Sequence, residues 1–119
     1  MNTFRFLDFS VYKLAKDFYK EVFFEIKKWN RENWEVGDQI RRALLSVILN
    51  IAEGSAKRSD KDFNRYIENA LGSINESVAG IDVAFELNLI SQVTRDRYFQ
   101  ISKDIAKQLG GLSRKLRNP

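Results

Sequence analysis

The sequence of 119 residues contains no cysteine and no histidine. Without cysteine the chain can form neither a disulfide nor a thiolate metal site, which is most simply explained by an intracellular protein. Without histidine it lacks the side chain that most often binds metals and transfers protons near neutral pH. We therefore expect a cytoplasmic protein that holds no metal or other cofactor.

Long hydrophobic runs are also missing. No window approaches the roughly 18 consecutive apolar residues of a membrane-spanning helix. The opening residues 1–10 lack the basic segment and the apolar run of a signal peptide. We expect no association with a membrane.

Positive charge is in small excess. The sequence has 20 lysines and arginines and 16 acidic residues, which gives a net charge of +4. This excess favours an anionic partner. Its placement is uneven, because the chain after Asp104 has no acidic residue. The basic residues that follow are Lys107, Arg114, Lys115 and Arg117.

What the sequence does contain is a helical pattern. Between residues 38 and 76, apolar side chains recur at intervals of three and four, and a basic turn at residues 55–58 divides them. Similar stripes precede and follow this pair, and no segment has the pattern of a strand. The prediction is an all-α single domain, an up-down-up-down antiparallel four-helix bundle. Its expected helices are residues 8–29, 39–53, 60–87 and 92–116.

The helix ends have recognisable signals. Residues 30–37 break the apolar pattern and are predicted to form a loop. Gly54 is expected to end the second helix in the left-handed conformation, and Asn88 to cap the third. The expected N-caps are Asp38, Ser59 and Ser91.

The first helix carries a second apolar line, formed by Tyr12, Tyr19 and Phe23. The wide apolar face that results is explained either by two neighbours within the bundle or by a subunit contact.

The residues give little basis for catalysis, and we expect that the protein is not an enzyme. The usual base for a nucleophile is absent with histidine, and no Glu-x-x-His pair could build a dimetal site. The single glycine of residues 54–59 does not have the spacing of a phosphate-binding loop. Glu53 and Glu76 could face each other across the central pair of helices. Paired carboxylates, however, bind an arginine more often than a substrate.

Several short motifs of the central pair occur in a specific order. They are Gln39-Ile40-Arg41-Arg42-Ala43, Ser46, Asn50-Ile51-Ala52-Glu53-Gly54, Arg58-Ser59-Asp60-Lys61, Ala70-Leu71-Gly72-Ser73 and Asn75-Glu76. Together they resemble the 23S rRNA intervening-sequence protein family, and the similarity extends more loosely over residues 9–116.

The resemblance implies a small bundle without known enzymatic activity that assembles into a ring, typically a pentamer. Members were first noticed as reading frames inside insertions in bacterial 23S rRNA genes. A more distant similarity is to the accessory proteins of diversity-generating retroelements, basic pentameric bundles that bind nucleic acid and a reverse transcriptase. The family usually has a proline two residues before the asparagine, where this chain has Ile48, so we expect a straighter second helix.

Six residues are candidates for a subunit interface or a structural polar contact. They are Arg42, Asn50, Glu53, Gly72, Glu76 and Gly80. We expect them on the backs of the second and third helices, where an isolated monomer would gain little from them. The glycines would permit close helix approach, and the polar groups would satisfy one another within or between subunits. The alternative is a solvated face with pairing inside each helix.

Two groups of cations are candidates for binding nucleic acid. They are Lys57 and Arg58 in the central turn, and Arg114, Lys115 and Arg117 near the end of the last helix. Repeated around a homo-oligomeric ring, they would present a multivalent positive surface to RNA or DNA. The alternative is that cations near helix ends complement the helix dipole and keep the protein soluble.

A second functional hypothesis is a structural or adaptor oligomer that binds another protein. Its docking residues would be exposed aromatics such as Phe24 or Trp34, which could equally be local packing residues. Added salt separates the two hypotheses, because it weakens phosphate binding steeply and an apolar contact little.

Overall fold

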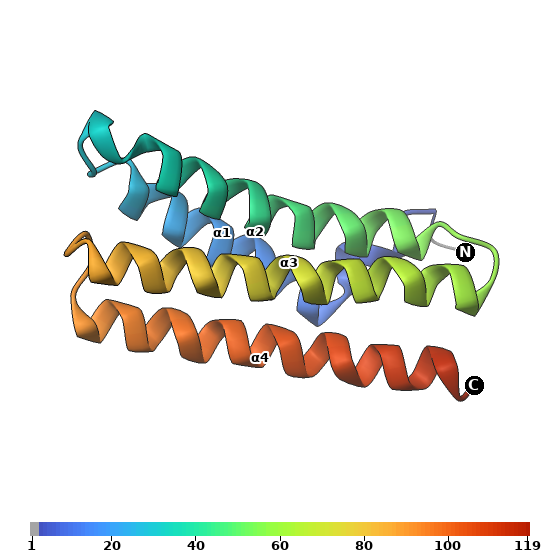
Figure 1. Cartoon of the computed structure of the whole chain (residues 1–119). Coiled ribbons are helices and arrows are strands. Elements are labelled where there is room, and N and C mark those ends of the chain that lie inside the picture. Colours follow the sequence, from blue (N-terminus) through green and yellow to red (C-terminus); the bar gives the residue numbers. More distant parts are fainter. Residues whose placement is uncertain (1–2) are drawn as a thin grey trace.

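The computed structural model describes residues 3–119, so the first two residues of the opening segment lie outside it. Four long helices make up most of this part: α1 (Ser10–Ile26), α2 (Trp34–Ser55), α3 (Asp60–Glu86) and α4 (Gln92–Arg117). Two short 3-10 helices, η1 (Arg5–Asp8) and η2 (Arg31–Asn33), precede α1 and α2. Residues 3–119 contain no strand, and the predicted all-α, up-down-up-down four-helix bundle is confirmed (Figure 1).

The core lies where the apolar stripes of the four helices meet. Each helix contributes side chains from its predicted stripe, because a spacing of three and four residues keeps them on one face. The largest fully buried ones are Phe18, Ile40, Ile51, Ile67, Ile74, Ile81, Ile105 and Leu109. Tyr12 and Tyr19 are half-buried and pack against this core. Part of the wide apolar face of α1 is therefore used within the bundle.

Helix boundaries differ from the prediction on both sides of the first connection. The first helix is shorter than predicted, because it ends at Ile26. Residues 30–37 are not a loop throughout, since α2 begins at Trp34. Gly37 is buried in this first turn, and a β-carbon there would lie 2.6 Å from Cγ2 of Ile26. The missing side chain lets the start of α2 pack directly on the end of α1.

Asp38 is not the N-cap of α2, because it lies inside the helix. Its carboxylate accepts hydrogen bonds from Arg41 at 3.1 Å and from Arg42 at 2.9 Å. Both are neighbours on the same helix face, at spacings of three and four residues. The side chain therefore binds two arginines and leaves the helix start uncapped.

Gly54 does not end α2 in the left-handed conformation. The helix continues to Ser55, and no glycine in residues 3–119 has a positive φ. A β-carbon at Gly54 would lie 2.7 Å from Cβ of Tyr66 and 2.9 Å from Cδ1 of Phe63. Close approach of α3, and not a turn conformation, explains this glycine.

The other helix ends follow the sequence signals. The hydroxyls of Ser59 and Ser91 accept hydrogen bonds from the backbone N–H of Asp62 and Thr94, both at 3.1 Å, so these N-caps are confirmed. Asn88 adopts a φ of 60°, the left-handed conformation expected just beyond the end of α3.

At Ile48, where the family usually has a proline, the helix α2 continues without interruption.

The seam between α1 and α4 is the least extensive contact between neighbouring helices of the bundle. Two polar contacts span it. The guanidinium of Arg97 donates two hydrogen bonds of 2.7 Å to the carboxylate of Glu21. The hydroxyl of Ser10 donates to Oε1 of Gln108 at 2.7 Å. The Arg97 hydrogen bonds hold the pKa of Glu21 below its usual value.

We predict that Gly54→Ala destabilises the protein by about 1–2 kcal/mol. Overpacking costs roughly 1–3 kcal/mol, and the better helix propensity of alanine offsets at most about 1 kcal/mol of it. The matched control is Gly110→Ala, because a β-carbon at Gly110 would meet nothing within 4 Å. It should leave stability unchanged or raise it. Urea unfolding followed by circular dichroism measures both variants, and a Gly54→Ala protein as stable as the wild type would contradict the packing argument.

We predict that the stabilisation from the Glu21–Arg97 pair depends on pH. A carboxyl whose folded-state pKa is lowered contributes stability above its unfolded pKa, and this contribution is lost as pH falls through the folded pKa. The ordinary value is 4.5. Glu21→Gln should therefore be less stable than the wild type at neutral pH, and the difference should shrink well below pH 4.5. Urea midpoints across that range test this, and a pH-independent difference would count against the ion pair.

Candidate functional site

All five cations predicted to bind nucleic acid lie at one end of the bundle. At this end α1 and α3 begin, and α2 and α4 end (Figure 1). Lys57 and Arg58 are in the turn between α2 and α3. The last turn of α4 carries Arg114, Lys115 and Arg117. We call these five residues and their surroundings the basic end.

A buried polar contact fixes the last turns of α4 against the start of α3. The hydroxyl of Ser113 donates to Oδ1 of Asn64 at 2.6 Å, and the amide of Asn64 donates to Glu68 at 3.1 Å. A surface pocket of about 400 Å³ between the same helices is lined by Asp60 and Lys61 of α3 and by Arg117 of α4. The turn between α2 and α3 leads directly into α3, so the two predicted groups of cations lie at the same end of the bundle.

The five cations of the basic end have no carboxylate partner. None of them takes part in an ion pair within residues 3–119. Four are exposed, and Lys57 is half-buried with its ammonium 5.0 Å from the ring centre of Tyr66. Asp60 and Asp62 lie nearby in the first turn of α3, so the positive potential is reduced but not cancelled. Cations without a partner keep their attraction for an external anion.

Sequence reasoning missed Arg5, which also lies at this end. Its guanidinium donates to the carbonyl oxygen of Ser55 at 3.3 Å from Nε and 3.1 Å from Nη2. It also lies over the rings of Phe9 and Phe63, at 5.9 Å and 5.4 Å. These contacts hold η1 against the end of α2. They join residues 50 apart in the sequence, so no local pattern could have indicated them.

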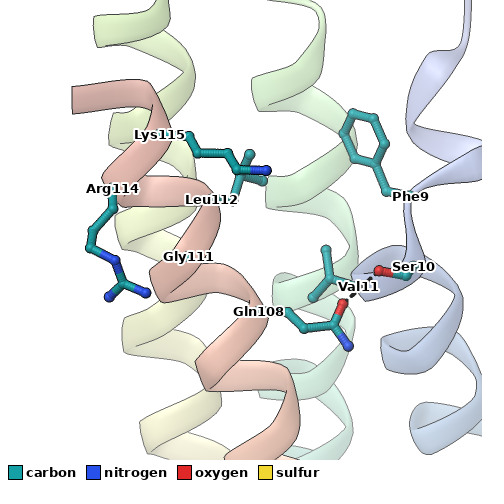
Figure 2. A pocket seen from close by; sticks show the side chains of 8 residues that line it. All are labelled: Phe9, Ser10, Val11, Gln108, Gly111, Leu112, Arg114 and Lys115. Carbon is teal, nitrogen blue, oxygen red and sulfur yellow. Dashed lines mark hydrogen bonds between the residues drawn. The ribbon is translucent and has the colours of Figure 1, made fainter. Parts of the chain in front are cut away.

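A pocket of about 480 Å³ opens beside the basic end, in the seam between α1 and α4 (Figure 2). We call it the seam pocket. Apolar groups of Phe9, Val11 and Leu112 form much of its wall, and no carboxylate lines it. Lys115 extends from α4 toward the side on which Phe9 lies, whereas Arg114 projects away (Figure 2).

The polar candidates on α2 lie along a shallow groove of about 280 Å³, which includes Arg42, Asn50 and Glu53. The amide of Asn50 donates to the carbonyl oxygen and the hydroxyl of Ser46, at 2.8 Å and 3.0 Å. Ser46 in turn shares a 2.8 Å hydrogen bond with Ser73 of α3. Within residues 3–119, none of Arg42, Asn50, Glu53 and Glu76 bonds to another of them. The serine pair, and not the glutamates, joins the two helices here.

Two apolar residues of this groove were not predicted as part of a site. Leu45 and Leu49 line it and remain 40% and 55% exposed. They lie four residues apart beside the polar line, so a helical projection could have shown them as a second, minor apolar stripe. An exposed leucine pair beside half-satisfied polar groups is a surface suited to burial by a partner.

The two candidate glycines differ in their surroundings. A β-carbon at Gly80 would lie 2.7 Å from Cγ1 of Ile40, so Gly80 faces α2 and permits close approach inside the chain. Its expected position on the back of α3 is wrong. Gly72 is exposed, and a β-carbon there would meet nothing within 4 Å. Nothing inside the described chain explains why a helix-disfavouring glycine stands at this position.

Residues 3–119 hold no group of three or more acidic side chains placed to bind a metal ion. In the same residues, no helix is both long enough and apolar enough to span a membrane.

The fold and the charge distribution define a class: small antiparallel four-helix-bundle proteins with a cationic end. Comparison with protein-family models identifies the family within this class. The model described as 23S rRNA-intervening sequence protein matches residues 7–111. The chain therefore belongs to this family, and the resemblance inferred from the motifs of the central pair is confirmed. A search of curated proteins gave no match.

Proposed function

We propose that this protein is a non-catalytic, homo-oligomeric protein that binds nucleic acid through the basic end. The observation that carries the proposal is the gathering of five cations without carboxylate partners at one end of the bundle. Membership of a family named after an rRNA intervening sequence is compatible with an RNA-related role. The ligand is RNA or DNA, and phosphate contacts supply the affinity.

Assembly would strengthen this binding. A rotation axis keeps every subunit at the same height along the axis, so the basic ends of all copies in a ring lie in one plane. Five copies, the number that the family resemblance implies, would place five basic ends around one circle. A polyanion that bridges several of them gains avidity without any new kind of contact.

We place the subunit contact on the outer face of α2 and α3, around Asn50, Glu53, Gly72 and Glu76. Gly72 has open space above it, so a neighbouring helix can approach closely there. The exposed leucines of the α2 groove, Leu45 and Leu49, supply apolar area on the α2 side of this contact. Arg42, already hydrogen-bonded to Asp38, would lie at the edge of this contact.

We predict that Gly72→Leu lowers the mass of the protein in solution while the helical content stays unchanged. In the single chain a β-carbon at this position meets nothing within 4 Å and leucine has the better helix propensity, so the subunit should fold. The matched control is Gly110→Leu, another open helical position, which should keep the wild-type mass. Light scattering coupled to size-exclusion chromatography measures the mass, and an unchanged mass for Gly72→Leu would remove Gly72 from the interface.

We predict that the double variant Lys57→Ala/Arg58→Ala binds nucleic acid more weakly and with a shallower dependence on salt. The slope of log K against log salt concentration is negative, and each lost phosphate contact makes it shallower by about 0.7–0.9. Fluorescence anisotropy against structured RNA, single-stranded DNA and duplex DNA, at low and near-physiological salt, provides the measurement. Unchanged affinity would remove the α2–α3 turn from the site.

The matched control is Lys27→Ala/Lys28→Ala, because it removes the same charge at the opposite end of the bundle. Both lysines are exposed, just beyond the end of α1. If binding depends on the basic end, the affinity of this control for nucleic acid stays close to that of the wild type. Equal weakening by both double variants would show that net charge alone decides, and would contradict the proposed interface.

A second candidate function is an adaptor that binds another protein through apolar contacts. It is favoured by the exposure of Phe24 and Trp34, 52% and 67%, in the last turn of α1 and at the start of α2, at the end of the bundle opposite the basic end. Absence of nucleic-acid binding even at low salt would favour this alternative.

A further inference from the structure

The seam pocket lies beside the basic end and combines an aromatic wall with a cation. We infer that it takes an unpaired nucleobase, so that the protein prefers single-stranded over duplex nucleic acid. The inference rests on the proposed function, because phosphate contacts at the basic end must first hold the strand. It adds a ligand class and a site that the charge distribution alone does not provide.

The wall of the pocket offers a prearranged surface for stacking. Phe9 is half-buried, and its ring lies nearly parallel to that of Phe63, with 6.5 Å between the centroids and 14° between the planes. The guanidinium of Arg5 lies over both rings. A ring held in this way loses little freedom on binding, and stacking on an aromatic side chain is the usual way proteins hold an unpaired base.

The polar groups of the pocket suit the edge of a base. Oε1 of Gln108 accepts the hydrogen bond of Ser10, which leaves the amide N–H groups of Gln108 available as donors. Every base carries acceptor atoms on its edge, either carbonyl oxygens or ring nitrogens. A cavity of about 480 Å³ also falls within the range of sites for small ligands.

The charge around the pocket suits the phosphate next to such a base. Lys115 lines the pocket and extends from α4 toward the side on which Phe9 lies (Figure 2), and no carboxylate among the lining residues would repel an anion. A base within a duplex is stacked and paired, so it cannot enter without unpairing. Loops and single strands have bases that are free to enter.

The test fills the pocket without removing charge. A β-carbon at Gly111 would meet only Nη2 of Arg114, at 3.9 Å, so Gly111→Leu should fold and place its side chain in the pocket. Its neighbour provides the matched control, because Gly110 is open as well and does not line the pocket. Both variants gain the same helix propensity and keep every cation.

The measurement is anisotropy with three labelled 12-mers at one low salt concentration: oligothymidylate, an abasic strand with the same phosphates, and a duplex. The wild type and Gly110→Leu should bind oligothymidylate at least about fivefold more tightly than the abasic strand. Gly111→Leu should bind both strands equally. The duplex, whose bases are stacked and paired, should bind more weakly than oligothymidylate at equal phosphate concentration.

Each other outcome contradicts the inference. If the wild type binds the abasic strand and oligothymidylate equally, the base makes no contact, although the proposed function stands. If Gly111→Leu keeps the preference, the base binds elsewhere. If the wild type binds none of the three, the proposed function fails and the inference fails with it. The wild-type comparison alone decides the first and third cases, whatever the stability of the variants.

Discussion

The close approach of α2 and α3 is the constraint on which the rest of the structure depends. Two glycines make it possible, one near each end of the pair: Gly54 against Tyr66 and Phe63, and Gly80 against Ile40. Between them Ser46 and Ser73 share a hydrogen bond across the helices. The other helices pack around this pair, α1 mainly on α2 and α4 mainly on α3. The chain alternates in direction from helix to helix. The basic turn between α2 and α3 and the basic last turn of α4 therefore lie at the same end of the bundle.

The fold was predictable because four apolar stripes with helical spacing admit few other arrangements. The core residues follow from this spacing, and the serine N-caps follow from local hydrogen bonding. The errors concern residues with two possible uses. A glycine near a helix end favours a left-handed turn on local grounds, but Gly54 and Gly37 serve helix packing. Asp38 could cap a helix or bind arginines of its own helix, and the start of α2 at Trp34 decides between these two uses.

The candidate site was predictable in its parts and not in its assembly. The cations of the basic end stand out as a shift in composition, but their adjacency needs the order and direction of all four helices. Arg5, Phe9 and Gln108 gave no signal, because their contacts join segments 50 to 98 residues apart. On α2 and α3, Asn50 finds its hydrogen bonds on its own helix, whereas Gly72 has no contact in the single chain that would explain it.

Both η1 and the end of α4 lie at the basic end (Figure 1). A purification tag or a reporter domain joined to either terminus would therefore sit next to the cations. An acidic tag would pair with the cations and neutralise them, and a bulky domain would block access to the seam pocket. The turn between α3 and α4 is at the far end of the bundle, and Leu87 there is 50% exposed. This turn is the place for a fluorophore or a surface tether that leaves the basic end open.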